Sequence, residues 1–270
     1  MLKYRLIPVL ILKNDRLVQS IQFKRYLPIG GAKIAIEFFV NWDVDEIVLL
    51  DIDATLKKRQ PQFDLISFFA RKCFVPFTVG GGISSLDDIR NVIKAGADKV
   101  CLNTAAIRFP ELITRGAERF GTQCITISID AKKNSQGEYE VYLLSGKEPT
   151  GMHPVEWAQK VEALGAGEIL LTSIERDGTK QGYDLELTRQ VAQAVSIPVI
   201  ACGGVGRMEH FVEGILKGSA HAVAAANIFQ YTEHSTIIAK AYLKKANIDI
   251  RLSSDVTYEG FTIDEAGRIT

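Results

Sequence analysis

Residues Pro76-Phe77-Thr78-Val79-Gly80-Gly81-Gly82 decide the fold, because a similar stretch recurs 122 positions later at Pro198-Val199-Ile200-Ala201-Cys202-Gly203-Gly204. Both are short apolar runs that end in glycines and precede an amphipathic helical pattern. Residues 45–50 resemble residues 167–171 at the same offset. Self-similarity at a fixed spacing indicates a repeated architecture. The chain therefore consists of two equivalent halves.

On both sides of these stretches, apolar runs alternate with helical patterns along the chain, which is typical of parallel strands covered by helices. The eight runs are residues 5–12, 45–53, 76–82, 98–103, 124–131, 167–174, 198–204 and 220–226. Two sets of four predict a single-domain α/β fold, a (β/α)8 TIM barrel with two pseudo-symmetric half-barrels. An open doubly wound sheet is the alternative, but it does not explain the two equivalent sets. We expect the barrel over residues 1–252 and a C-terminal extension over 253–270.

The composition and charge of the chain argue against several classes of partner and site. The 270 residues are 47% apolar and 24% charged, with 32 basic and 32 acidic side chains. Without a basic excess there is no electrostatic basis for a nucleic-acid or membrane partner. The first apolar run is too short to span a bilayer, so we expect a cytoplasmic protein. The four cysteines are far apart and form no metal-ligand pattern, and we expect neither a metal nor a cofactor.

The carboxyl ends of barrel strands carry the chemistry in this architecture. Here Gly80-Gly81-Gly82 and Gly203-Gly204 occupy equivalent ends, each ahead of a helical pattern. Backbone N–H groups without side chains can approach an anion, and a helix start adds positive potential. Two such sites predict a ligand with a phosphate at each end. The alternative is that these glycines only permit tight turns.

Asp130 ends the apolar run 125–129, which places a carboxylate at a partly desolvated rim. Desolvation raises a carboxyl pKa and suits the group to general acid–base chemistry. Its counterpart in the first half-barrel is Ile11, which cannot transfer a proton. A structural carboxylate that accepts hydrogen bonds from loop amides is the alternative for Asp130.

Several segments together resemble the cyclase subunit of imidazole glycerol phosphate synthase. They are residues 7–8, 77–83, 98–100, 103–106, 129–132, 165–174, 176–179 and 203–206. The resemblance extends from residue 1 to about residue 252. It implies a barrel that forms a heterodimer with a glutaminase subunit, receives ammonia from it and uses the ammonia at the phosphate-binding mouth.

The resemblance also assigns roles to individual residues. One phosphate would contact Gly82, Asn103 and Thr104, and the other would contact Asp177, Gly178, Gly204, Ala225 and Ala226. An ammonia gate at the amino-terminal face would consist of Arg5, Glu46, Lys99 and Glu168. Asp98 and Gln123 match positions of the glutaminase interface. As charged groups, the four gate residues could equally form a purely structural ion-pair cluster.

Four positions depart from the family pattern. Ile11 replaces an aspartate that acts with the Asp130 equivalent, Gln19 replaces a lysine of the first loop, Asp53 replaces a small hydroxyl residue, and Ala226 replaces a serine. Loss of a general acid–base group typically costs about 10²–10⁴-fold in rate. Efficient cyclase chemistry is therefore not expected.

The leading hypothesis is an ammonia-using synthase subunit of a glutamine amidotransferase complex. It is similar to divergent paralogues associated with amidination of a sugar for lipopolysaccharide or other surface polysaccharide, where a third protein handles the sugar. The first alternative is a cyclase of histidine biosynthesis that uses Asp130 alone or with Asp53. The second is a non-catalytic scaffold or activator of the glutaminase.

Overall fold

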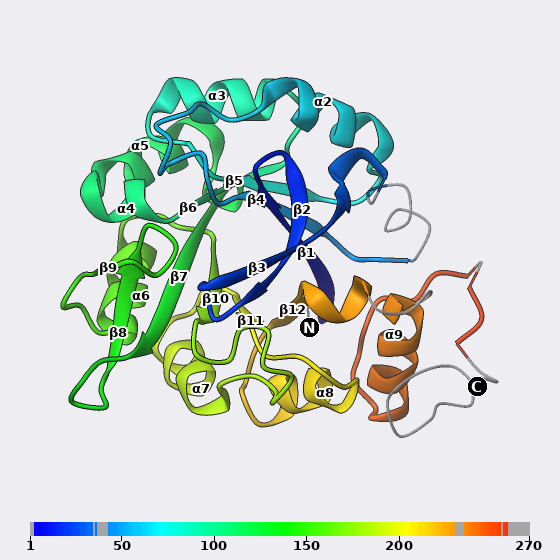
Figure 1. Ribbon diagram of the computed structural model, residues 1–270. Coiled ribbons are helices and arrows are strands. Elements are labelled where there is room, and N and C mark those ends of the chain that lie inside the picture. The colour runs from blue at the N-terminus through cyan, green and yellow to red at the C-terminus, as the bar shows by residue number, and fades with distance from the viewer. Residues whose placement is uncertain (1–2, 35, 37–42, 231–234, 255, 259–270) are drawn as a thin grey trace.

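Eight parallel strands form the centre of the molecule and close into a cylinder (Figure 1). The computed structural model describes residues 3–34, 36, 43–230, 235–254 and 256–258. The strands, in the order of their pairing, are β1 (Arg5–Lys13), β4 (Ile47–Asp51), β5 (Phe77–Gly80), β6 (Lys99–Leu102), β7 (Ile125–Lys133), β10 (Glu168–Ser173), β11 (Val199–Cys202) and β12 (Ala222–Ala225). The register Arg5↔Ala222 joins β12 to β1. This closure confirms the predicted (β/α)8 barrel and excludes an open sheet, which would leave two unpaired edge strands.

Helices surround the barrel (Figure 1). They are α2 (Phe63–Lys72), α3 (Leu86–Lys94), α4 (Thr104–Arg108), α5 (Glu111–Phe120), α6 (Pro154–Ala163), α7 (Leu185–Ala194), α8 (Glu209–Leu216) and α9 (Ser235–Lys245), with short 3-10 turns at Thr122–Cys124 and Asn227–Gln230. Local sequence explains where they begin. The Ser85 hydroxyl accepts a hydrogen bond from Asp88 N at 3.1 Å and starts α3, and the Asp184 carboxylate does the same for α7. Such caps satisfy N–H groups that the first helical turn leaves unpaired.

Strand β7 shows how sequence alternation places side chains inside and outside the barrel. Ile125, Ile127 and Ile129 belong to the large apolar cluster between the barrel and the helices. The alternate residues of β7 are Thr126, Ser128 and Asp130. Because successive side chains of a strand point to opposite faces, these polar residues face the barrel interior.

The two half-barrels share more than their strand order. The first strand of each, β1 and β7, has 9 residues. Each continues into antiparallel strands, which are β2 (Arg16–Ile21) and β3 (Arg25–Gly31) after β1, and β8 (Tyr139–Leu143) and β9 (Glu148–Pro149) after β7. Figure 1 shows β2 and β3 lying across the front of the barrel. Both additions extend the wall at the carboxyl ends of the strands.

The described part of the C-terminal extension packs against the barrel. The hydroxyl of Tyr258 hydrogen-bonds the carboxylate of Asp43 and accepts a bond from Ser253 N at 2.8 Å. The same Asp43 lies 3.1 Å from the ammonium group of Lys240, a fully buried residue of α9. Residues 259–270 lie outside the described residues. Within the described part of the chain, no helix has the length and apolar character needed to cross a membrane.

Candidate functional site

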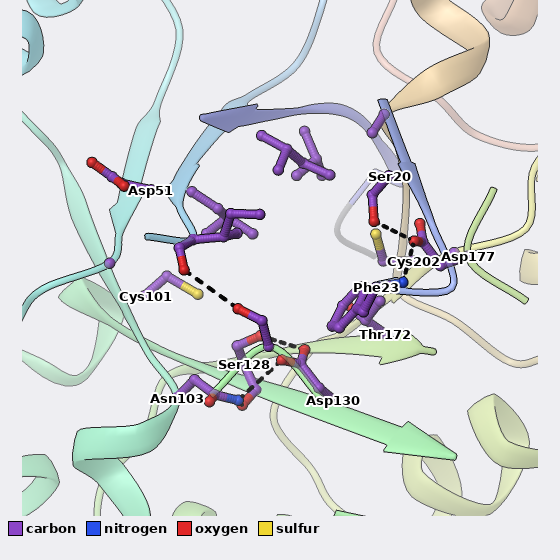
Figure 2. Close-up of a pocket in the computed structure, with 18 of the residues that line it drawn as sticks. Ser20, Phe23, Asp51, Cys101, Asn103, Ser128, Asp130, Thr172, Asp177 and Cys202 are labelled. Atoms are coloured by element: carbon purple, nitrogen blue, oxygen red, sulfur yellow. Dashed lines mark hydrogen bonds between the residues drawn. The ribbon is translucent and has the colours of Figure 1, made fainter. Parts of the chain in front are cut away.

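A pocket of about 1190 Å³, the open space at its mouth included, lies at the carboxyl ends of the barrel strands. Figure 2 shows residues of its wall, which come from both half-barrels. All nine residues predicted for catalysis or phosphate binding line this pocket, namely Gly82, Asn103, Thr104, Asp130, Asp177, Gly178, Gly204, Ala225 and Ala226. The structure therefore brings the predicted set together, and the roles assigned to its members stay predictions.

The first glycine turn follows β5. Gly81 and Gly82 have φ angles of +103° and +73°, a left-handed conformation that favours glycine. A Cβ atom on Gly81 would lie 2.1 Å from the carbonyl oxygen of Asp51, so no larger residue fits there. Thr104, which starts α4, also lines this side of the pocket. Backbone N–H groups and one hydroxyl can donate hydrogen bonds to an anion here.

The second glycine turn follows β11 and has the same geometry. Gly203 and Gly204 have φ angles of +94° and +105°. A Cβ atom on Gly204 would lie 2.1 Å from the carbonyl oxygen of Gly182. Ala226 contributes no hydroxyl, so this half of the pocket relies on backbone donors. The two turns occupy equivalent places, as the repeat in the sequence predicts.

Asp130 lies at the centre of the polar wall. It is 8% exposed. The Ser128 hydroxyl donates to its Oδ1 at 3.1 Å, and the Asn103 amide donates to its Oδ2 at 3.3 Å (Figure 2). Burial raises the pKa of Asp130 to about 7, although the Ser128 hydrogen bond opposes the shift. A carboxyl that titrates near neutral pH can accept or donate a proton during catalysis.

Ile11 faces the pocket from the position in the first half-barrel that corresponds to Asp130. Ile11 pairs in register with Leu50, and Asp130 pairs with Thr172, 122 positions after Leu50. Ile11 belongs with Val9 and Leu50 to an apolar cluster inside the barrel. One wall of the pocket is therefore apolar where the opposite wall carries a titratable carboxyl.

Asp53 does not replace the missing carboxylate. It is not among the residues that line the pocket. Its oxygens lie 2.8 Å from the Lys13 ammonium group and 2.9 Å from that of Lys57. Burial acts to raise its pKa, but the hydrogen bonds from Lys13 and Lys57 prevail and lower it to about 2. The group is thus a permanently ionised member of a salt-bridge cluster, and Asp53 is unsuited to proton transfer near neutral pH.

Asp177 connects the pocket to the β2–β3 hairpin. The Ser20 hydroxyl donates to Asp177 Oδ2 at 2.6 Å, and Phe23 N approaches the same oxygen at 3.4 Å (Figure 2). The carbonyl oxygen of Ser20 also accepts a bond from the Asn227 amide at 2.9 Å. These contacts hold the hairpin against the second half-barrel.

Sequence reasoning missed several pocket residues. Ser20, Phe23 and Tyr26 come from the β2–β3 hairpin, and Leu144 and Ser145 come from the turn after β8. They belong to segments that lie between the eight apolar runs. A usable signal existed, because each half begins with a long strand followed by turn residues and a further alternating run.

At the opposite end of the barrel four charged side chains form a closed ion ring, defined here as Arg5, Glu46, Lys99 and Glu168. The Arg5 guanidinium lies 2.7 Å from Glu46 and also contacts Glu168. The Lys99 ammonium lies 2.9 Å from each carboxylate. Thr78 Oγ1 adds a hydrogen bond to Glu46 at 2.7 Å. Each cation therefore bridges both anions at the amino ends of β1, β4, β6 and β10.

The two residues predicted for the partner interface lie on the same face as the ion ring. Asp98 directly precedes Lys99, and its carboxylate accepts a bond from Phe77 N at 2.8 Å. Gln123 precedes β7. Both are exposed. Both lie at the amino-terminal rim, and their role in docking stays a prediction.

Comparison with known proteins agrees with this geometry. The family described as "Histidine biosynthesis protein" matches residues 5–236. A protein of Vibrio vulnificus (strain YJ016), provisionally named imidazole glycerol phosphate synthase subunit hisF2, is 54% identical over 269 residues. The match covers 99% of this chain and 98% of that relative. With this match and its closed barrel, the chain belongs to the histidine biosynthesis protein family and is a HisF-like member of it.

Proposed function

We propose that this chain is the ammonia-using, cyclase-like subunit of a glutamine amidotransferase complex. A glutaminase docks at the amino-terminal face, ammonia enters through the ion ring, and it reacts in the pocket at the opposite end. The observation that carries the proposal is the intact ion ring opposite a pocket that unites all nine predicted residues. The resemblance to the cyclase subunit and the hisF2 relative support the same assignment.

The ring suits a gate for a neutral molecule. Its two cations and two anions compensate one another, so ammonia meets no net charge at the entrance. Each cation contacts both carboxylates. A small displacement of Lys99 therefore breaks two contacts while Arg5 still holds the carboxylates. Docking of a partner on the adjacent rim is a plain means of causing such a displacement.

The pocket suits addition of ammonia with one proton-transfer group. When ammonia attacks an electrophilic carbon, its nitrogen becomes positively charged and must lose a proton. Asp130, with its pKa of about 7, can accept that proton in its ionised form. By the family resemblance, ring closure with lysis uses two carboxylates. The apolar Ile11 therefore favours an acceptor whose reaction needs only one.

We propose further that the acceptor is a sugar destined for surface polysaccharide, handed over with the help of a third protein. The support is the combination of an intact ring with changes at Ile11 and Ala226, which the resemblance associates with divergent paralogues. The test supplies the purified chain with its cognate glutaminase, glutamine and the bisphosphorylated ribonucleotide substrate of the cyclase family. We expect no appreciable turnover, and turnover at ordinary cyclase rates would overturn this acceptor assignment.

A cyclase of histidine biosynthesis is the second candidate, because the relative carries that name and Asp130 is retained. The Ile11→Asp variant separates the two. In a degenerate cyclase the restored carboxylate raises ribonucleotide turnover by about 10²-fold or more. In a pocket adapted to another acceptor, it leaves turnover unchanged.

The Asp130→Asn variant distinguishes the proposed ammonia-using subunit from a scaffold without catalysis. In a complex that aminates its acceptor, loss of the Asp130 carboxyl lowers product formation by about 10²–10⁴-fold. Unchanged product formation would favour the scaffold. Glutamine hydrolysis by the partner serves as the control for intact assembly.

The docking face offers an independent test. Phe74, three residues before β5, is 88% exposed at the amino-terminal rim. Exposed aromatic side chains commonly anchor protein interfaces. We expect Phe74→Asp to weaken glutaminase binding at least tenfold by calorimetry. Phe109→Asp, at a 50% exposed phenylalanine after α4, is the matched control and should bind normally. Equal affinities for both variants would move the docking site elsewhere.

A further inference from the structure

The inner face of β7 carries one polar atom that the fold leaves without a partner. Thr126 is 1% exposed, and its hydroxyl oxygen has no hydrogen-bond partner among the described residues. A buried polar group without a partner costs about 1–3 kcal/mol. Such groups in native proteins commonly mark a bound water, an ion or a ligand.

The register places Thr126 between the ion ring and the pocket. Thr126 pairs with Glu168 of the ring on one side and with Cys101 of the pocket wall on the other. All three face the barrel interior, because side chains that pair in register point to the same face of a sheet. The hydroxyl thus lies inside the barrel beside the ring.

The next inward residues of β7 continue toward the pocket. Ser128 lies two positions beyond Thr126 and donates to Asp130 Oδ1 at 3.1 Å. Figure 2 shows Ser128, Asp130 and Cys101 among the residues that line the pocket. The other strands contribute the apolar side chains Ile7, Val48, Leu170, Ile200, Ala222 and Ala224 to the interior. Their hydroxyls lie at its two ends, Thr78 on Glu46 of the ring and Thr172 in the pocket wall. On β7 the hydroxyls of Thr126 and Ser128 therefore lie between the ring and the Asp130 carboxyl.

We infer that Thr126 is a binding station for one ammonia-sized polar molecule on its way from the ion ring to Asp130. The inference rests on the proposed function. A threonine hydroxyl can both donate to the nitrogen lone pair of ammonia and accept from its N–H. In an interior lined mainly by apolar side chains, this contact compensates part of the desolvation of ammonia. Ser128 then offers the next hydroxyl, already oriented by Asp130.

The chain provides a matched pair of variants. Thr126→Val keeps the shape of the side chain and removes the hydroxyl. Ser173→Ala removes another buried barrel-strand hydroxyl that has no partner among the described residues. Ser173 pairs in register with Ala131, which packs in the outer cluster under the helices, so its hydroxyl faces away from the barrel interior.

Crystal structures of the full chain and both variants, grown with ammonium chloride at alkaline pH, test whether Thr126 holds a polar molecule of this size. We expect one density peak within hydrogen-bond distance of Thr126 Oγ1 in the wild type and in Ser173→Ala, and its loss in Thr126→Val. An empty site in the wild type, or a peak that persists in Thr126→Val, would overturn the inference.

A solution measurement keeps the test independent of crystals. In methyl-labelled threonine NMR spectra, ammonium chloride at alkaline pH should shift the Thr126 methyl signal at least twofold more than sodium chloride of equal ionic strength. The Thr188 methyl signal is the internal control, because its buried hydroxyl already donates to Asp184 O at 2.7 Å. Equal shifts at both threonines would contradict a station at Thr126.

These results separate the inference from the proposed function. Neither measurement requires the glutaminase, whereas co-purification of the two proteins tests the complex by itself. A chain that binds ammonia at Thr126 but no glutaminase would refute the proposed function alone. If the complex forms product but ammonia does not shift the Thr126 methyl signal, only the inference about Thr126 is refuted.

Discussion

Ile11 and Asp130 occupy equivalent backbone positions and have opposite chemical character. Each lies at the pocket end of the first strand of its half-barrel, and each is 8% exposed. For an isoleucine this environment is favourable. For an aspartate it disfavours the charged form, which is why the pKa of Asp130 lies near 7.

This shift predicts how the Asp130→Asn variant responds to pH. The folded pKa of Asp130 lies above its ordinary value of 3.8, so the folded state binds more protons than the unfolded state between about pH 4 and pH 7. Wild-type stability therefore falls as pH rises through this window. Asparagine is neutral throughout, so the variant should gain about 2–3 kcal/mol relative to wild type between pH 5 and pH 8. Urea unfolding at both pH values measures the gain, and a difference that is independent of pH would contradict the shifted pKa.

Ser20 provides a second prediction at this scale. Its hydroxyl is buried and donates to the Asp177 carboxylate at 2.6 Å. A hydrogen bond to a charged group contributes about 1.5–3 kcal/mol. Ser20→Ala should therefore lower the free energy of unfolding by that amount, as urea denaturation would show. Ser135→Ala, at an exposed turn, is the control and should change stability by less than about 0.5 kcal/mol. Equal effects would mean that the hairpin is not held through Asp177.

At the scale of elements, the first residues of several strands bring the four charged groups of the ion ring together. β1, β6 and β10 each begin with a ring residue, and Glu46 directly precedes β4. Both carboxylates are nearly buried, with side-chain exposures of 2% and 6%. Two buried anions need both cations, so the ring couples four strands that are not all neighbours.

Removal of one cation of the ion ring should lower the free energy of unfolding. Lys99→Met leaves two buried carboxylates with Arg5 alone, and breaking a buried pair typically costs about 3–5 kcal/mol. We expect a loss of about 3 kcal/mol in urea denaturation. Arg108→Met removes an ion pair whose side chains are 47% and 46% exposed, and it should cost less than about 1 kcal/mol. Similar losses in both variants would show that the ring is solvated.

At the scale of the whole molecule, the pairing of β12 with β1 makes the two half-barrels one closed sheet. The extension adds a further link through Tyr258, Asp43 and Lys240. Neither half is a closed unit alone, so each depends on the other for its strand pairing. The repeat in the sequence therefore does not imply two folding units.

This closure predicts cooperative unfolding. Far-UV circular dichroism, which follows secondary structure, and tryptophan fluorescence, which follows the tertiary environment, should give coincident transitions in urea. The physical reason is that unfolding of one half-barrel exposes two strand edges of the other half. It also exposes the apolar side chains inside the barrel. Two separated transitions, with partial loss of circular dichroism in the first, would contradict a single cooperative barrel.

The barrel, the eight strands and the polar strand ends were predictable from the sequence, because strand and helix periodicity and glycine turns are local patterns that the 122-residue repeat reinforces. The family resemblance named the phosphate-site residues, and they lie together because the carboxyl ends of all barrel strands meet at one mouth. Three properties follow from the three-dimensional structure alone: Asp53 belongs to a lysine cluster, the hairpin of Ser20 and Phe23 closes one side of the pocket, and Thr126 lacks a partner among the described residues. These properties depend on which side chains from distant segments come within hydrogen-bond distance. A pattern along one strand carries no such information.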